Sequence, residues 1–465
     1  MRIELTFSFF ERNDAGHSRA RKRVYLGGMM KKRRKQYTRQ ELESKSQEEL
    51  IEIILAQQAP RKTSGNSSCP PSLDQKSNEA FDPKWGGKPG HPGRGKVRST
   101  PDKVVKVSLD RCPACQRSLS HHPEVETTAH QTVEVEIVTR TVEYQRVRKY
   151  CPRCGKRVTA PAPEEMPSGR FAPEVEALSS YFHFRHHIPQ QRLLEVLRDV
   201  FGVSMSKGKL NTILTAPPAQ IQAFYETLAQ QLATQEVLGV DETGYRVCKH
   251  THWLWVFQNA HLTFFTLEPS RGSRVLQAVL GKVFEGTLVS DFFSAYNRIQ
   301  ARKQKCNAHL LRELKYILEK EPELDYAARL LQLILDAKTL AEQRKNYLPL
   351  AYQTGVTRLK LRREALLQEP LPQSSDSRRI QKRLRKYQED IFRFLEDETV
   401  PFDNNGAERE IRGAVIHRKV SACFRSEKGP KAFAQLTSFL QTSRKRGQNI
   451  FQRLVEAYRI DPAPT

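Results

Sequence analysis

"VLGVD" at residues 237–241 decides the fold class, because it is a short apolar run that an aspartate closes. Similar runs follow at 252–258 (HWLWVFQ), 262–268 (LTFFTLE) and 286–291 (GTLVSD). The pattern RVLQAVL at 274–280 has helical spacing and lies between the last two runs. Strand-length runs of this kind, interrupted by a helix, are typical of an α/β domain.

Asp241 and Asp291 each close one of these runs. If their strands are neighbours in a sheet, both carboxylates lie at the same edge. Taken alone, each aspartate is more often a turn or cap residue. Together they favour a metal site, because hard cations such as magnesium bind carboxylate oxygens.

A third carboxylate is needed to hold two ions about 4 Å apart, and the segment PFDNNGAEREIRGAVIHRK at 401–419 supplies one. Asp403 or Asn404 can cap the helix that follows. Glu408 and Glu410 lie on different faces of that helix, and the local pattern favours Glu408 only weakly.

Two C-x-x-C pairs, Cys112 with Cys115 and Cys151 with Cys154, predict one structural zinc. Each pair places two thiolates on one side of a tight loop, and two such loops complete a tetrahedral sulfur site. We expect a strand pair at 131–150 to bring the second pair back to the first, in a module that resembles a zinc ribbon. A redox pair of cysteines is the alternative.

The other cysteines, Cys69, Cys248, Cys306 and Cys423, have no evident partner. Cys306 lies three residues before His309. The two residues form either a further metal site or, as we favour here, a packed thiol beside a histidine on a helix.

Charge and length limit the class of protein. A chain of 465 residues is too long for one compact core, and a net charge of +25 with a pI near 9.8 requires an anionic partner, such as nucleic acid or a membrane surface. No apolar run approaches the roughly 18 residues of a spanning helix, and LTFSFF near the N-terminus is too short for a signal peptide. We therefore expect a soluble, cytoplasmic protein that binds nucleic acid.

Composition divides the chain into seven parts. Residues 173–215 show three short helices, for which a helix-turn-helix and a plain helical spacer are both open interpretations. The predicted parts are a basic disordered tail (1–40), a short helix (41–58), a Pro/Gly-rich linker (59–105), the zinc-binding module (106–160), a helical, helix-turn-helix-like region (168–225), the α/β domain (230–415) with a helical insertion (318–398), and a C-terminal helical region (416–465).

Four segments together resemble transposases of the insertion-sequence 66 family: VDETG (240–244), SDFFSAY (290–296), KCNAHLLREL (305–314) and DNNGAEREIRGAVIHRK (403–419). The segments NSSCPPSLD and GKPGHPG resemble the linker that precedes the zinc-binding part in that family. The resemblance runs from about residue 60 to the C-terminus. Asn307 departs from it, because the family usually has tryptophan between the cysteine and the alanine.

The resemblance implies an Asp-Asp-Glu triad, Asp241, Asp291 and Glu408, on a ribonuclease-H-like core. By this match Glu408 is the third acid and Glu410 is not. The triad would hold two Mg²⁺ (or Mn²⁺) ions, cut DNA at the ends of the insertion sequence and join the freed 3′ end to target DNA.

The implied partners are DNA, further copies of the chain on DNA, and accessory proteins of the same element, without a membrane. In a bacterium the protein would lie on the nucleoid when bound to DNA. The alternatives are a catalytically silent, zinc-containing DNA-binding protein and a ribonuclease on the same scaffold. Candidate DNA contacts are His309, Arg409, Arg412, Arg418 and Lys419.

Overall fold

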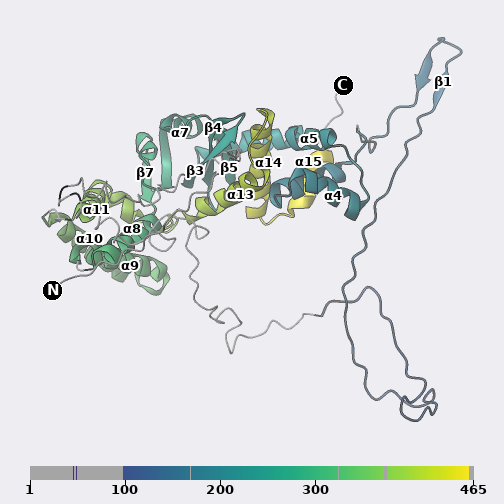
Figure 1. The fold of residues 1–465 in the computed structure, drawn as a ribbon, viewed down its shortest axis with the longest axis horizontal. Helices are drawn as coiled ribbons and strands as arrows, with labels where there is room; N and C mark the ends of the chain where they lie inside the picture. The colour runs from purple at the N-terminus through teal and green to yellow at the C-terminus, as the bar shows by residue number, and fades with distance from the viewer. Residues whose placement is uncertain are drawn as a thin grey trace, which may run out of the picture. The chain divides into compact units, whose positions relative to one another are not determined.

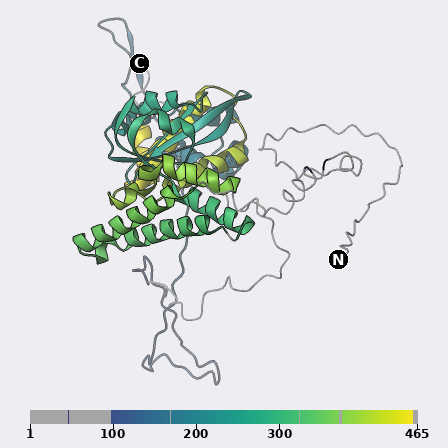
Figure 2. The same ribbon diagram turned by 90° about the vertical axis from the view of Figure 1, so that its left-hand side faces the viewer.

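The computed structural model describes residues 46, 49, 98–167, 169–322, 324–370 and 374–459 (Figures 1 and 2). The predicted tail at 1–40, nearly all of the helix at 41–58 and most of the linker lie outside the described residues, as does Cys69.

A five-stranded mixed sheet forms the centre of the α/β part, and it confirms the predicted α/β class. The strand order is β5-β4-β3-β6-β7, in which β3, β4 and β5 are antiparallel neighbours and β6 and β7 continue parallel to β3. The strands are β3 (Val237–Val247), β4 (His250–Gln258), β5 (Thr263–Glu268), β6 (Val283–Ser290) and β7 (Gln300–Lys305). The four predicted strands correspond to β3, β4, β5 and β6. The prediction that Asp241 closes its strand was wrong, because β3 continues to Val247 in its pairing with β4.

Strand β7 was not predicted, because its sequence QARKQK has no apolar alternation. It lies at the edge of the sheet and pairs with β6, with Ser290 opposite Lys305. Charged residues are common on edge strands, so a search for apolar runs misses such a strand.

Helices cover both faces of the sheet. Successive side chains of β4 point to opposite faces, and those at 254–257 are all apolar, so both faces need a covering layer. Leu254 and Val256 pack in a core with α13 (Asn405–Ser421) and α14 (Lys428–Lys445). Trp255 and Phe257 point to the opposite face and pack with α7 (Ser273–Leu280). In β3, Asp241 shares the α13 side with Tyr245, because the two residues are an even number of positions apart.

The helical region before the sheet confirms the three predicted helices. Gly202 ends one of them in the left-handed conformation (φ 66°), and Ser206 caps the next by accepting the N–H of Lys209. The elements are α3 (Pro173–Ser180), a π-helix η3 (Tyr181–Arg185), α4 (Gln190–Phe201), α5 (Lys207–Thr215) and α6 (Ala219–Leu232).

A helical block with its own hydrophobic core lies between β7 and α13. Figure 1 shows α8, α9, α10 and α11 gathered in one bundle. The predicted break near 369–377 separates α10 from α11. The helices are α8 (Asn307–Lys320), α9 (Asp325–Glu342), α10 (Pro349–Gln368), α11 (Ser375–Lys386) and α12 (Gln388–Phe392).

The strand pair expected at 131–150 was wrong. The structure has instead a short hairpin around the second C-x-x-C pair, β1 (Arg148–Tyr150) with β2 (Arg157–Thr159). Val133 and Val135 are 90% and 82% exposed, so the alternating run has no apolar surface to pack against. A two-stranded ribbon is marginal without such a surface.

The chain closes with α13, α14 and α15 (Ile450–Arg459). Helix α13 continues through the boundary that was predicted at residue 415. None of the helices in the described part is long and apolar enough to cross a membrane.

Candidate functional site

Asp241 and Asp291 lie at the same edge of the sheet. Strands β3 and β6 pair in parallel with Gly239 opposite Val289, a constant offset of fifty residues. If this register continues for two more residues, Asp241 lies opposite Asp291, which directly follows the end of β6. The expected meeting of the two aspartates at one edge follows from this register.

Helix α13 is fixed to β3 beside Asp241. The Asn404 side chain donates a hydrogen bond to the carbonyl of Val240 (2.8 Å). Glycine at position 239 allows this close approach, because a Cβ there would lie 2.6 Å from Gln258 Nε2 and 2.8 Å from Asn404 Oδ1. Glu408, in the first turn of α13, is thereby held close to the end of the sheet.

The two acids of α13 face different neighbours. Glu408 is partly exposed, and its Oε1 lies 3.5 Å from Arg312 of α8. Glu410 is buried against α14, where it pairs with Arg444 (2.8 Å) and Lys445 (3.6 Å). Glu410 is therefore neutralised by two cations of the fold, whereas the charge of Glu408 acts on Asp241.

The carboxylates act on one another electrostatically. Burial raises the pKa of Asp241 well above its ordinary value, and the charges of Glu242, Asp291 and Glu408 raise it further. The N–H of Glu242, which Asp241 Oδ1 accepts at 2.8 Å, acts in the opposite direction. Mutual repulsion of this kind is what a bound cation relieves.

A network that the sequence did not predict supports the strand side of this cluster. Glu242 is buried and pairs with Arg271 at 2.8 Å, and it accepts a hydrogen bond from the buried Tyr296 hydroxyl. The Arg271 guanidinium lies between the rings of Trp253 (4.6 Å) and Phe293 (4.1 Å). The only signal in the sequence is the acid that directly follows Asp241.

Lys305 was also missed. It is fully buried at the end of β7, and its Nζ donates to the carbonyl of Asp291 (2.9 Å) and to Ser290 Oγ (3.2 Å). Burial lowers the pKa of Lys305 to about 8, while the carboxylates of Asp291 and Asp390 act to raise it. This lysine fixes the main chain that carries Asp291.

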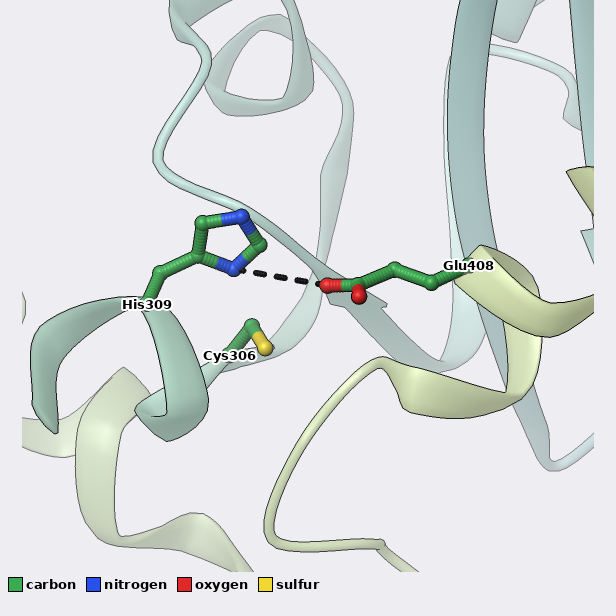
Figure 3. A group of neighbouring side chains, drawn as sticks. All are labelled: Cys306, His309 and Glu408. Atoms are coloured by element: carbon green, nitrogen blue, oxygen red, sulfur yellow. Dashed lines mark ion pairs between the residues drawn. The ribbon is translucent and has the colours of Figure 1, made fainter. Parts of the chain in front are cut away.

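Cys306, His309 and Glu408 converge in the same region, as Figure 3 shows. One ligand atom from each lies within 4.8 Å of the other two. His309 Nδ1 lies 3.7 Å from Glu408 Oε1. Burial lowers the pKa of His309 and raises that of the Cys306 thiol to about 12.

Asn307, the departure from the family pattern, is buried between α8 and the segment before α13. Its side chain donates to the carbonyl of Ile391 (2.9 Å) and its main-chain N–H to that of Phe402 (3.3 Å). The asparagine therefore joins α8 to α12 by a hydrogen bond.

The four cysteines predicted to bind zinc form two separate turns. The main-chain N–H of Cys115 lowers the pKa of the Cys112 thiol, and that of Cys154 lowers the pKa of Cys151. Among the residues described, the structure does not gather all four sulfurs into one group of metal ligands. The zinc site stays a prediction.

The family model described as Transposase IS66 family matches residues 168–432, which include Asp241, Asp291 and Glu408. The chain belongs to the IS66 family of transposases. It is also similar to the uncharacterized protein y4jD of Sinorhizobium fredii, at 23% identity over 393 residues, 76% of this chain and 75% of that protein. Family membership makes it a DNA-processing protein with a function in transposition.

The candidate DNA contacts of this IS66 family member differ in their exposure and in whether the fold already engages them. Arg409, Arg412 and Lys419 are exposed along α13. Arg418 is held inside the fold, because its guanidinium donates to the carbonyl of Gly244 and lies near Thr243 Oγ1 (3.3 Å). His309 lies beside Glu408.

The basic stretches of the helical block are largely engaged within it. Arg362 pairs with Asp336 (2.6 Å), and Arg379 pairs with Glu313 (2.5 Å). The buried Arg363 lies 3.1 Å from Glu389. These arginines stabilise the block, so a role in binding DNA stays a prediction.

Proposed function

We propose that this protein is a DNA transposase that cuts and joins DNA at the ends of its insertion sequence, with Asp241, Asp291 and Glu408 as its catalytic triad. One observation carries the proposal: three acids from β3, from the end of β6 and from α13 come close enough that Asp291 and Glu408 both raise the pKa of Asp241. The mixed five-stranded sheet between helical layers supports a ribonuclease-H-like core.

The donor set fits hard divalent cations. All three residues offer carboxylate oxygens, which magnesium and manganese prefer. The raised pKa of Asp241 means that its charge is poorly compensated by the protein itself. Asp241, Asp291 and Glu408 would hold two Mg²⁺ or Mn²⁺ ions, which when bound supply an activated nucleophile and charge neutralisation at the leaving oxygen.

The residues around the triad hold its members in place. Lys305 fixes the carbonyl of Asp291, and Asn404 fixes the start of α13. Arg409 and Arg412 are exposed on the helix that carries Glu408, where they would contact DNA phosphates. Asp241 within β3 and Asp291 directly after β6 follow the register of adjacent strands, so they would face the scissile phosphate from the same side.

Zinc would be held by Cys112, Cys115, Cys151 and Cys154, with a structural role. The lowered pKa values of Cys112 and Cys151 support thiolate ligands. Metal analysis of protein purified without chelator should find one tightly bound zinc per chain, and Cys151→Ser should lose it. Retention of that zinc in Cys151→Ser would contradict the assignment.

The test of the activity uses an oligonucleotide duplex that carries the end of the insertion sequence. Asp291→Asn should abolish Mg²⁺-dependent strand cleavage and leave binding of the same duplex largely intact. A matched control is Asp325→Asn, because Asp325 is an exposed aspartate at the start of α9. Unchanged cleavage by Asp291→Asn would remove this residue from the site.

The same assay separates the two alternatives. A wild-type protein that binds the duplex and cleaves no DNA with either cation would be the silent DNA-binding protein. Cleavage of an RNA strand in place of the DNA would indicate the ribonuclease.

A further inference from the structure

Cys306, His309 and Glu408 offer one sulfur, one nitrogen and one oxygen ligand within 4.8 Å of one another. The residues come from the beginning of α8 and from the first turn of α13, about a hundred positions apart in the chain. Figure 3 shows the imidazole and the thiol on one side and the Glu408 carboxylate reaching toward them from the other.

The thiol is held in a fixed position. Cys306 is fully buried between β7 and α8, and its Sγ accepts the main-chain N–H of Asn404 at 3.2 Å. This N–H favours the thiolate, but burial outweighs it in the metal-free protein, so a bound cation would have to displace the thiol proton. Asn404 also fixes α13 to β3, so one residue places both Cys306 and the helix that carries Glu408.

The imidazole is turned toward the same point. His309 Nδ1 is buried and has no hydrogen-bond partner among the described residues. It lies 3.7 Å from Glu408 Oε1, which is too long for a hydrogen bond. Two ligands that each lie about 2 Å from one zinc ion are separated by about 3–4 Å, so this spacing suits a shared ion.

One neighbour opposes a cation here. Arg312 lies 3.5 Å from Glu408 Oε1, and its guanidinium also donates to the carbonyl of Ala308. The contact with Glu408 is long and partly exposed, so it is weak. A metal ion on Oε1 would displace only this weak contact. Arg312 would keep its hydrogen bond to the carbonyl of Ala308.

We infer that Cys306, His309 and Glu408 form a binding site for a zinc-class divalent cation. It is separate from the four-cysteine site and overlaps the carboxylate site for magnesium at Glu408. The mixed sulfur, nitrogen and oxygen donors suit zinc or cobalt and do not suit magnesium. Three protein ligands leave a fourth position open for water.

Glu408 cannot serve both sites at once, because it is the member that they share. A zinc ion on Cys306 and His309 would draw Glu408 away from Asp241 and Asp291. Zinc is therefore expected to inhibit Mg²⁺-dependent cleavage. This consequence rests on the proposed function, whereas the binding of zinc does not.

The binding test uses cobalt as the probe on full-length protein, first given one equivalent of zinc to fill the four-cysteine site. Wild-type protein should bind one further Co²⁺, with thiolate-to-cobalt charge-transfer absorption. Cys306→Ser and His309→Gln should bind one equivalent fewer and lack that absorption. Cys423→Ser, which removes an exposed cysteine elsewhere, should match wild type.

Equal cobalt stoichiometry and equal spectra for wild type and Cys306→Ser would overturn the site. Thermal melts establish whether each variant is folded. X-ray absorption of cobalt-loaded wild type needs no variant: sulfur together with nitrogen or oxygen donors supports the site, and oxygen donors alone overturn it.

The inhibition test compares each protein with its own zinc-free cleavage rate. Half-inhibition of Cys306→Ser should need at least about tenfold more zinc than wild type, since one ligand is lost. Equal sensitivity would overturn the inhibitory role. A protein that binds cobalt as expected but never cleaves DNA would count against the proposed function and not against the metal site.

Discussion

The ionised side chain of Asp241 destabilises the folded protein. Burial and three neighbouring acids raise the pKa of its carboxyl group. A raised pKa means that the native protein binds this proton more tightly than the unfolded chain does. Asp241 therefore costs stability once the pH exceeds the ordinary aspartate value of about 3.9, and that cost grows until its native pKa is passed.

Asp241→Asn should accordingly stabilise the metal-free protein while removing cleavage. Asparagine keeps an oxygen that can accept the N–H of Glu242 and removes the repelled charge. We expect the free energy of unfolding at pH 7 to rise by about 1 kcal/mol or more, as measured by denaturant titration without divalent cations. A loss of stability would contradict the electrostatic account.

Arg412 and Arg418 allow a matched comparison on one helix. Arg412→Ala should weaken DNA binding and lower the slope of log affinity against log salt by about 0.9, because one exposed phosphate contact is lost. Arg418→Ala should instead lower the free energy of unfolding by about 1–3 kcal/mol, since its hydrogen bond to Gly244 is lost. DNA affinity measured at several salt concentrations and a denaturant titration of each variant check both outcomes. A stability loss in Arg412→Ala together with a DNA-binding loss in Arg418→Ala would contradict these assignments.

A chain of buried hydrogen bonds joins three elements, namely β3, α13 and the π-helix η3. Tyr245 Oη lies 2.7 Å from His417 Nδ1, and His417 Nε2 lies 3.4 Å from His183 Nε2. His183 Nδ1 must donate to the carbonyl of Ile188 (2.8 Å), so its Nε2 accepts from His417, which in turn accepts from Tyr245. With these directions both histidines are neutral, and the Nε2–Nε2 contact excludes protonation of both rings at once.

This chain predicts loss of stability in mild acid. Burial lowers the pKa of His417 to about 3 and also lowers that of His183, whereas unfolded histidines titrate near about 6.5. The unfolded chain thus takes up protons first as the pH falls from about 6.5. Between pH 6 and pH 5 the two histidines should cost about 2 kcal/mol of unfolding free energy.

His417→Gln is the comparison, because other titrating groups contribute equally to both proteins. The pH-dependent loss, from denaturant titrations at pH 6 and pH 5, should be about 1 kcal/mol smaller in the variant. An identical loss in wild type and variant would show that His417 is not kept neutral by the fold.

Strand β6 has a position that admits only glycine. A Cβ at Gly286 would meet the carbonyl oxygens of Gln235 and Glu236, the latter at 2.7 Å, and main chain cannot move aside as a flexible side chain can. Gly286→Ala should lower the free energy of unfolding by about 1–3 kcal/mol or more. Gly208→Ala in α5, where the nearest atom is 4.0 Å away, should stabilise by about 0.5–1 kcal/mol. Denaturant titration of the two variants measures both changes, and equal effects would refute the steric argument.

At the scale of the whole molecule, the net charge of +25 dominates encounters with DNA. If six or more phosphates are neutralised, affinity for non-specific duplex should fall about 1,000-fold or more between 50 and 200 mM salt. Fluorescence anisotropy at several salt concentrations measures the slope. A nearly flat dependence would mean that the positive charge serves another purpose.

The sequence by itself determined the α/β class, four of the five strands, the three helices before the sheet and the helical block. These features are local: apolar periodicity and turn residues act within a few positions of the chain. The meeting of Asp241 and Asp291 was predicted only on the condition that their strands are neighbours, and the pairing of β3 with β6 supplies that condition. The sequence misled about the strand pair near the cysteines, which was expected at 131–150. Alternating valines form a strand only where another surface can bury them, and Val133 and Val135 are exposed.

Only the tertiary structure decided which side chains meet. Lys305 at the carbonyl of Asp291, Arg418 against Gly244, and Glu410 between Arg444 and Lys445 are contacts across distant segments. Their residues look like ordinary surface charges in the sequence. The same holds for Cys306 and His309, which no local pattern joins to Glu408, because their approach depends on Asn404 fixing α13 against both the sheet and the thiol.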